Sequence, residues 1–308
     1  MEKKFRLITR SDMDGLVCAV IFKELGMIDE IKFVHPKDMQ DGIIDITEND
    51  IITNLPYSPK AHLVFDHHES EAMRNGEADN YHIDPHADSA ARIVYEYYGG
   101  KEKLPRVSTD MMVAVDKADA AQFDVIDILD PQGWELLSFL MDSRTGLGRF
   151  REFSVSNYQL MMDLIDYCID HTIDEIMLLP DVAERVKLYQ SYSDKFLDQI
   201  ERCSTVYENL VVLDLTNEEI IFPGNRFTIY ALHQDCNISI HKMWGFKKQN
   251  TVFATGKSIL KRDSNTNIGE LMLKYGGGGH QAAGTCQIDN DKADEVLKEL
   301  IDTITNDG

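Results

Sequence analysis

Short apolar runs alternate with helix-like stretches over the first 125 residues of the chain. Strands are expected at Phe5–Thr9, 31–34, 50–53 and 61–65, and a helical apolar pattern follows the first strand up to Leu25. Another helix is expected from Ser89 to Tyr98, because a serine begins this segment and two glycines end it. Strands that alternate with helices usually pair in parallel through crossovers. This part of the chain is therefore predicted to be an α/β unit with a parallel sheet.

The pattern changes twice in the rest of the chain. From about Gly133 to Cys203 the signal is almost wholly helical, and residues 182–200 are predicted to form one long connecting helix. Strand signals return at 209–214, and an amphipathic helix is expected over 291–304. We therefore predict an α/β fold with a first domain over residues 1–190, a helical connector to about residue 205, and a smaller α/β domain over residues 206–308.

Composition narrows the class of protein and of partner. The 308 residues carry a net charge of −22, which argues against binding to long duplex nucleic acid, since that requires a basic surface. The five cysteines are scattered and never occur as Cys-x-x-Cys, which disfavours a disulfide framework and a structural zinc site. The longest apolar run is too short to cross a bilayer. We expect a cytoplasmic protein with a small partner and no membrane contact.

Two of the predicted strands run directly into side chains that can bind a metal. Asp12 and Asp14 follow the first strand, and Asp66, His67 and His68 follow the strand at 61–65. In open parallel sheets ligands bind at the carboxyl ends of strands, so both groups should face one crevice. Carboxylates with imidazole suit manganese, iron or zinc, whereas carboxylates alone favour magnesium. An isolated Asp-x-Asp is more often a turn or a helix cap, so this interpretation rests on the two groups occurring together.

The run Gly276–Gly279, followed by His280, is the most unusual segment of the chain. Four glycines give no side-chain packing, but their N–H groups can approach an anion closely. Residues 256–280 are locally basic in an otherwise acidic chain, with Lys257, Lys261, Arg262 and Lys274 against Asp263 and Glu270. We interpret the segment as a phosphate-binding loop. The alternative is a flexible hairpin between Lys274 and Thr285, and neither a Walker A loop nor a Rossmann fingerprint fits.

In their order along the chain, these motifs resemble the DHH phosphoesterase superfamily. They are Asp12-Met-Asp-Gly15, Asp66-His-His68, Asp119-Ala-Ala-Gln-Phe123 and Gly276-Gly-Gly-Gly-His280. The resemblance covers nearly the whole chain and is greatest to two-domain members of the nano-RNase, pAp-phosphatase and exopolyphosphatase-related types. It implies a manganese-dependent phosphohydrolase, in which the first domain is catalytic and the second binds substrate. One or two manganese ions are implied, with magnesium or another divalent ion as the alternative, and a homodimer is possible.

The resemblance also implies roles for individual residues. Metal ligands are implied at Asp12, Asp14, His67 and Asp119. Asp66 is expected to orient the metal ligands, and His68 to contact the phosphate or the leaving oxygen. Substrate binding is implied for Arg262, Gly278, Gly279 and His280.

Two residues depart from the pattern of the superfamily. Arg10 stands where many relatives have a histidine, and Asn54 where they have a bridging aspartate. Asn54 is a weaker ligand and Arg10 cannot bind a cation, so a single metal held by Asp14, His67 and Asp119 is the best-supported site. Arg10 is then expected to hold a phosphate oxygen in the catalytic step.

The preferred interpretation is hydrolysis of a phosphate ester in a short nucleotide: an oligonucleotide, a dinucleotide or 3′-phosphoadenosine 5′-phosphate (pAp). Two alternatives stay open. One is an exopolyphosphatase, whose long anionic substrate calls for a longer basic groove. The other is a non-catalytic nucleotide-binding protein with a degenerate metal site, for which Arg10 and Asn54 are the argument.

Overall fold

The computed structural model describes residues 3–308, which divide into two compact units. Unit 1 holds the residues up to Gln122, Pro131–Ser143 and Gly148–Lys187, and unit 2 holds Phe123–Asp130, Arg144–Leu147 and Leu188–Gly308. The division falls inside one long helix, α11 (Pro180–Cys203), which continues from unit 1 into unit 2. This helix contains the predicted connecting helix at 182–200. The domain boundary near residue 205 stays a prediction.

Unit 1 is built on a parallel sheet of five strands. Their order is β2-β1-β3-β4-β5, and every neighbouring pair is parallel. The strands are β1 (Phe5–Thr9), β2 (Ile28–Phe33), β3 (Asp50–Thr53), β4 (Leu63–Asp66) and β5 (Tyr81–Ile83). From β1 the chain adds β2 on one side of the sheet, and then β3, β4 and β5 on the other side. The strand order therefore switches between β1 and β3, and ligands bind beyond the carboxyl ends of the strands at such a point. Asp12 follows β1 at this edge, and Asn54 follows β3.

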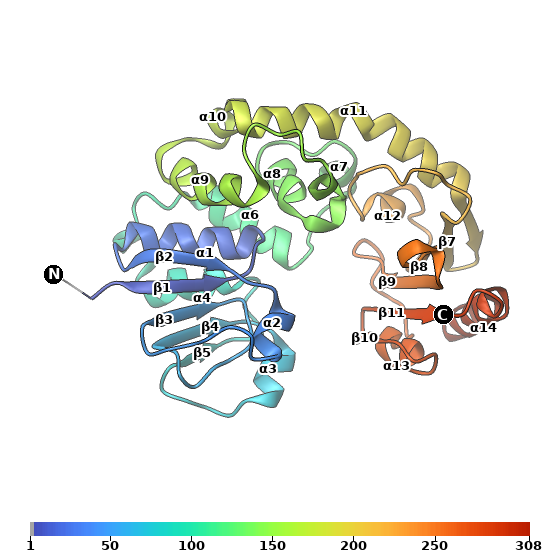
Figure 1. Ribbon diagram of the computed structural model, residues 1–308, viewed down its shortest axis with the longest axis horizontal. Helices are drawn as coiled ribbons and strands as arrows, with labels where there is room; N and C mark the ends of the chain where they lie inside the picture. The colour runs from blue at the N-terminus through green and yellow to red at the C-terminus, as the bar shows by residue number, and fades with distance from the viewer. Residues whose placement is uncertain (1–2) are drawn as a thin grey trace. The chain divides into compact units, whose positions relative to one another are not determined.

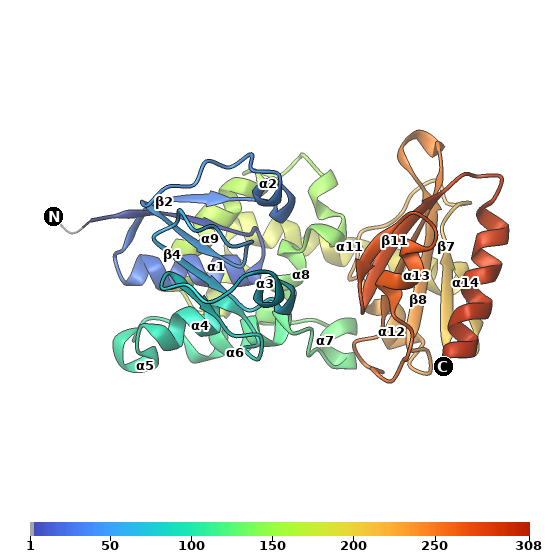
Figure 2. The same cartoon turned by 90° about the horizontal axis from the view of Figure 1, so that it is seen from below.

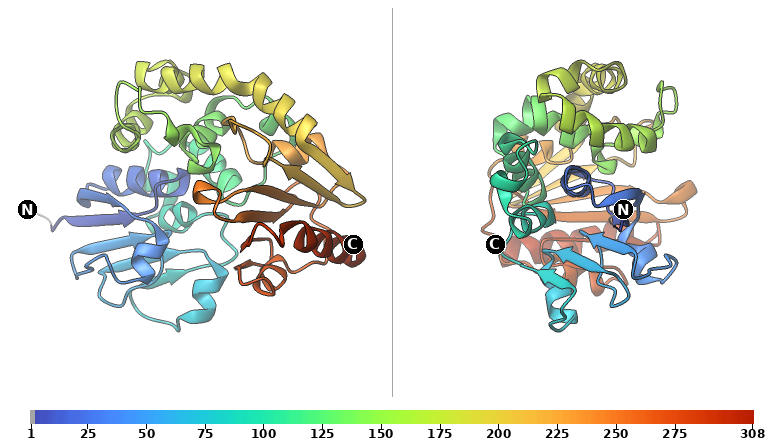
Figure 3. Two further views of the ribbon diagram at one scale, coloured as in Figure 1. Left: turned by 45° about the vertical axis from the view of Figure 1, so that its right-hand side comes forward. Right: turned by 90° about the vertical axis from the view of Figure 1, so that its left-hand side faces the viewer.

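Both faces of this sheet are covered, which explains why its strands are apolar without strict alternation. Leu7, Ile51 and Phe65 point into a core formed with α1, α4, α6 and α9, whereas Ile8, Ile52 and Val64 point into a second core on the opposite face. In Figures 1 and 3 helix α1 lies along the sheet. The helices assigned to unit 1 are α1 (Met13–Glu24), α2 (Pro36–Gln40), α3 (Glu69–Arg74), α4 (Ala90–Tyr97), α5 (Gly100–Lys103), α6 (Thr109–Asp119), α8 (Gly133–Met141), α9 (Asn157–Asp170) and α10 (Ile173–Leu178).

Two side-chain caps fix the helices that matter for the site. The Asp12 carboxylate accepts a hydrogen bond from the Gly15 amide at 3.0 Å and starts α1. The Ser89 hydroxyl accepts from the Arg92 amide at 3.0 Å and starts α4, as the sequence predicted. The first cap places Asp14 in the first turn of α1, and the second places the amides of Ala90 and Ala91 in the first turn of α4 within reach of Asp14.

Unit 2 contains a mixed sheet of six strands in the order β10-β11-β9-β8-β7-β6. Only β7 and β8 pair in parallel. Helices α13 and α14 cover one face, and their apolar residues form a core with β7, β8 and β9; Figure 2 shows α14 beside the sheet. The elements are β6 (Ser204–Tyr207), β7 (Leu210–Asp214), β8 (Ile238–Trp244), β9 (Thr251–Lys257), β10 (Gly278–His280), β11 (Ala283–Ile288), α7 (Val125–Leu129), α12 (Thr228–Leu232), α13 (Ile268–Leu273) and α14 (Ala293–Asp307), with a 3-10 turn at Phe246–Lys248. Two more 3-10 turns, at Ser143–Thr145 and Leu147–Arg149, contain residues assigned to both units.

The predicted fold class, an α/β protein with a parallel sheet and a smaller second α/β part, is confirmed. The short edge strands β5 and β6 were not predicted, and in unit 2 the sequence analysis named no individual strand except the one at 209–214, which corresponds to β7. Within residues 3–308 no helix is both long enough and apolar enough to span a membrane.

Candidate metal centre and active site

Three side chains from separate parts of unit 1 meet at the carboxyl edge of its sheet. Asp14 lies in the first turn of α1, His67 directly after β4, and Asp119 at the end of α6. Each offers a ligand atom, and these atoms all lie within 4.8 Å of one another. The structure thus brings together the three residues that the sequence analysis favoured for a single metal.

Asp14 is fixed by the start of α4. Its carboxylate is 1% exposed and accepts hydrogen bonds from the Ala90 amide at 3.1 Å and the Ala91 amide at 2.7 Å. Burial raises the pKa of Asp14 well above its ordinary value, and the nearby Asp119 carboxylate raises it further, while His67 opposes this. A carboxylate in this position therefore needs a positive partner to remain charged.

His67 presents one ring nitrogen to the group. Its Nδ1 lies 3.1 Å from the Ala87 carbonyl, which can only accept, so Nδ1 carries the proton and Nε2 has a lone pair in the neutral ring. Nε2 lies 2.7 Å from Asp119 Oδ2. Burial opposes a charge on this ring, but Asp119 and then Asp14 outweigh it and raise the pKa of His67 to about 9.

Asp66 organises the two histidines that follow it. Its side chain is fully buried, and Oδ1 accepts from the His67 amide at 2.9 Å and lies 2.7 Å from His68 Nδ1. The His68 side chain is 41% exposed. Because Asp66 holds the proton on Nδ1 of His68, the other ring nitrogen is an acceptor in the neutral ring and a donor in the cation.

Asp12 lies beside the group and is held by neutral and cationic donors. Arg10 Nε is 3.0 Å from Asp12 Oδ2, and Asn54 Nδ2 donates to Asp12 Oδ1 at 3.2 Å. The two residues that depart from the superfamily pattern therefore both contact this aspartate. Asn54 also has a left-handed backbone, with φ 54°, at the tight turn that ends β3.

Several buried atoms at this edge fit a cation. Asn54 Oδ1, Asp66 Oδ2 and His67 Nε2 are buried, and none has an aligned hydrogen-bond partner within residues 3–308. Buried polar atoms are rarely left without a partner. The carboxylates of Asp14 and Asp119 with the imidazole of His67 are a suitable donor set for manganese, iron or zinc. The residues present therefore fit a divalent metal ion.

A partly buried ion pair involves the helix that carries Asp119. Arg92 on α4 pairs with Asp116 on α6, and the Ser89 hydroxyl donates to Asp116 Oδ1 at 2.7 Å. The pair joins α4, which holds Asp14, to α6, which carries Asp119. The sequence analysis did not predict the Arg92–Asp116 pair or the contacts of the Ala90 and Ala91 amides with Asp14. The one sequence signal for this region was Ser89, which marked the start of α4.

The substrate residues predicted in the second domain lie in unit 2. Gly278, Gly279 and His280 form β10, an exposed edge strand paired with β11, and Arg262 lies in the loop between β9 and α13, where its Nε donates to the Ile259 carbonyl. A shallow hollow of about 320 Å³ borders the three β10 residues. The segment therefore forms a hairpin, as in the alternative interpretation of the glycine run, and its strands are regularly paired.

Close packing explains most of the glycine run. A Cβ at Gly277 would lie 2.2 Å from the Thr285 carbonyl oxygen, and one at Gly279 would lie 2.2 Å from that of Ala283. Gly276 has φ +74°, a conformation that favours glycine. Gly278 has open space beside it, so it is the one position of the four where neither packing nor backbone conformation requires glycine.

Known proteins were compared with the chain. No protein-family profile and no curated protein sequence matches it. Among solved structures, the pGpG-specific phosphodiesterase PggH from Vibrio cholerae is 62% identical, with a TM-score of 0.92 over 99% of this chain and 100% of that one. CDC45 from Entamoeba histolytica is similar in fold at 9% identity (TM-score 0.50, 99% and 96% of the chains), and manganese-bound exonuclease RecJ is more distant (TM-score 0.49, 12% identity, 98% and 90%).

The first of these matches covers both units at high identity and shows the family. It confirms the predicted superfamily, and that protein is a phosphodiesterase specific for a short nucleotide, which agrees with the predicted reaction class. The chain belongs to the DHH phosphoesterase superfamily, in the family of this phosphodiesterase.

Proposed function

We propose that the chain is a manganese-dependent phosphodiesterase that hydrolyses the linear dinucleotide pGpG to two molecules of GMP. The observation that carries the proposal is the convergence of Asp14, His67 and Asp119 in a chain that is 62% identical to a pGpG-specific phosphodiesterase. The net charge of −22 favours a small substrate over a long nucleic acid. Five free cysteines suit the reducing cytoplasm, where we place the protein.

Asp14, His67 and Asp119 are the proposed metal ligands, with Asp12 and Asn54 beside them. When bound, a divalent ion there polarises a phosphoryl oxygen and lowers the pKa of water toward neutrality. The Ala87 carbonyl keeps the His67 ring in the orientation and tautomer that direct Nε2 into the group. Asp66 acts as a positioning residue for both histidines.

Arg10 and His68 are the proposed catalytic side chains. Arg10 is anchored through Nε to Asp12, and its guanidinium is expected to bind a non-bridging phosphate oxygen as charge develops there. His68 is exposed and backed by Asp66, so its protonated ring can donate a proton to the leaving oxygen and take up another from solvent before the next turnover. For Arg262, Gly278, Gly279 and His280 we propose binding of the distal part of the substrate.

The direct test measures product from the purified full-length chain. We expect GMP from pGpG with manganese, none after chelation with EDTA, and much slower turnover of pAp and polyphosphate. Phosphate release from polyphosphate without cleavage of pGpG would instead favour an exopolyphosphatase. Metal-dependent pGpG binding without product would favour the non-catalytic alternative and contradict the proposal.

Arg10→Ala is expected to lower kcat/KM for pGpG by about 10- to 100-fold, because a hydrogen bond to a charged group is worth about 1.5–3 kcal/mol. The metal stoichiometry, measured by calorimetric titration, should stay that of the wild type. The matched control is Arg74→Ala, which removes an exposed guanidinium that pairs with Glu71. Unchanged turnover in Arg10→Ala would remove Arg10 from the mechanism.

A further inference from the structure

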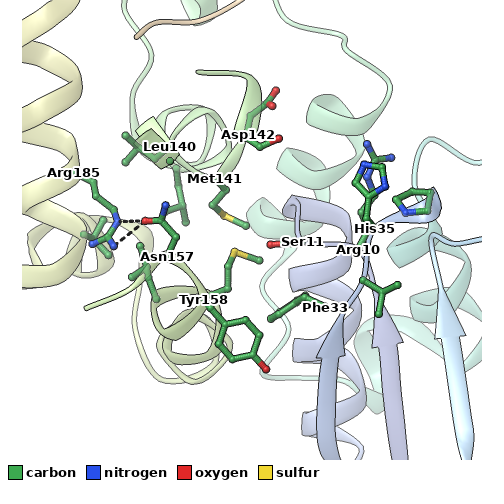
Figure 4. A pocket seen from close by; sticks show the side chains of 18 residues that line it. Arg10, Ser11, Phe33, His35, Leu140, Met141, Asp142, Asn157, Tyr158 and Arg185 are labelled. Carbon is green, nitrogen blue, oxygen red and sulfur yellow. Dashed lines mark hydrogen bonds between the residues drawn. The ribbon is translucent and has the colours of Figure 1, made fainter. Parts of the chain in front are cut away.

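A cavity of about 470 Å³ lies within unit 1, beside the candidate metal centre. This volume is typical of a small-molecule site. Figure 4 shows Arg10, Ser11, Phe33 and His35 on one side of it, and Asn157, Tyr158 and Arg185 on the other. Its walls are largely apolar, with Leu137, Leu140, Met141, Leu160, Met161 and Val182 among them. Arg10 belongs both to this cavity and to the metal centre, through its ion pair with Asp12.

The cavity contains an amide whose orientation is fixed from behind. Asn157 Oδ1 accepts from Arg185 Nη2 at 3.0 Å and lies 3.3 Å from Arg185 Nε (Figure 4). Arginine can only donate, so the oxygen of the Asn157 amide faces Arg185 and the NH₂ group faces away from it. Asn157 therefore offers hydrogen-bond donors to the cavity that it lines.

Arg185 is itself held too tightly to turn toward a ligand. It is 2% exposed, donates to the carbonyls of Asp181 at 2.7 Å and Val155 at 2.8 Å, and lies over the Phe153 ring. Every one of these contacts comes from unit 1. Because these contacts fix the Arg185 guanidinium, it holds the Asn157 amide in one orientation. Removing Arg185 would also leave several buried acceptors unpaired.

The same cavity contains an acceptor and flat apolar surfaces. Asp142 follows the end of α8, and a carboxylate has enough lone pairs to accept from a ligand as well as from protein donors. Phe33 and Tyr158 form an edge-to-face pair with ring centroids 6.0 Å apart. An aromatic edge, apolar walls, one oriented amide donor and one carboxylate are the parts of a nucleobase site.

We propose that this cavity binds a guanine base of the substrate, with Asn157 donating to O6 and Asp142 accepting from N1–H and N2–H₂. The inference rests on the proposed function for the phosphate chemistry, and it adds the residues that select the base. Adenine reverses the pattern, because it presents a donor at C6 and an acceptor at N1, so the Asn157 amide would face a donor and Asp142 a lone pair. Arg10, at the junction of the cavity and the metal centre, would hold the phosphate joined to that nucleotide.

Asn157→Asp tests the proposal with almost no change of shape. The new carboxylate keeps its pairing with Arg185 and repels O6, so the ratio of kcat/KM for pGpG to that for pApA should fall by about 10- to 100-fold. Asp142→Asn should lower the same ratio by about tenfold. The ratio cancels any general loss of active protein. Gln159→Glu is the matched control: it adds the same charge two residues along α9 at a side chain paired with Asp163, and should leave the ratio unchanged.

A second measurement separates this inference from the proposed function. Calorimetric titration of the metal-free full-length chain with GMP and with AMP should show tighter binding of GMP, and Asn157→Asp should abolish the difference. If the wild type cleaves no dinucleotide but still prefers GMP, the proposed function fails and the guanine site stands. If the wild type cleaves pGpG while both variants keep its base preference, the guanine site is overturned and the phosphodiesterase stands.

Discussion

Asp119→Asn is expected to lower kcat/KM for pGpG by about a thousandfold and to weaken manganese binding in calorimetry. The Asp119 carboxylate lies 2.7 Å from His67 Nε2 and within 4.8 Å of the Asp14 ligand atom, so the amide removes a negative charge at the centre of the group. A metal ion contributes several kcal/mol to the stabilisation of a phosphoryl transition state, and each 1.36 kcal/mol is a factor of ten in rate.

Asp166→Asn provides the control for this variant. It makes the same chemical change at an exposed carboxylate, which pairs with Lys23 on the surface of unit 1. We expect wild-type activity and wild-type manganese affinity from it, since surface pairs contribute little. Full activity in Asp119→Asn would mean that the metal centre is elsewhere.

Gly15→Ala is expected to lower the free energy of unfolding by about 3 kcal/mol or more and to abolish activity, as overpacked positions with a rigid neighbour do. A Cβ at this position would lie 1.9 Å from the Arg10 carbonyl oxygen and 2.8 Å from Thr9 Oγ1. The obstacle is backbone, so α1 must shift away from the end of β1. Asp14 immediately precedes Gly15 and Asp12 lies three positions before it, so both would move with the helix start.

Gly76→Ala is the matched glycine variant. A Cβ there meets no atom within 4 Å, and the backbone of Gly76 is not left-handed. Its free energy of unfolding should equal that of the wild type or rise slightly, because alanine restricts the unfolded chain. Urea denaturation of both variants measures the difference. Equal stability of Gly15→Ala and the wild type would show that the turn after β1 is not tightly packed.

Local patterns predicted most elements of unit 1 because those elements are either uniformly apolar or well capped. β1 and β3 fall at the expected residues, and α4 (Ala90–Tyr97) begins after the serine that marked it. β5 was missed because three residues, Tyr81–Ile83, are too few to show a period. β6 was missed because it directly follows α11, so no turn residues separate it from the helical signal.

The sequence predicted the metal ligands themselves but not the contacts that hold them in place. Asp14, His67 and Asp119 follow recognisable motifs, so their convergence was expected from the sequence. The amides of Ala90 and Ala91 have no side-chain signature, and their contact with Asp14 depends on how α4 packs against α1. The orientation of Asn157 likewise depends on Arg185, which lies 28 positions later in the chain. Such long-range contacts are set by tertiary packing and leave no local pattern.

The spacing of the three ligands along the chain has a consequence for biosynthesis. Asp14 lies in α1, His67 follows β4 and Asp119 ends α6, so more than a hundred positions separate the first ligand from the last. A nascent chain that has emerged only as far as β4 lacks the third ligand, and an unfolded chain does not hold the others together. Loading with the ion must therefore follow synthesis of α6 and docking of that helix, which protects the growing polypeptide from capturing a metal prematurely.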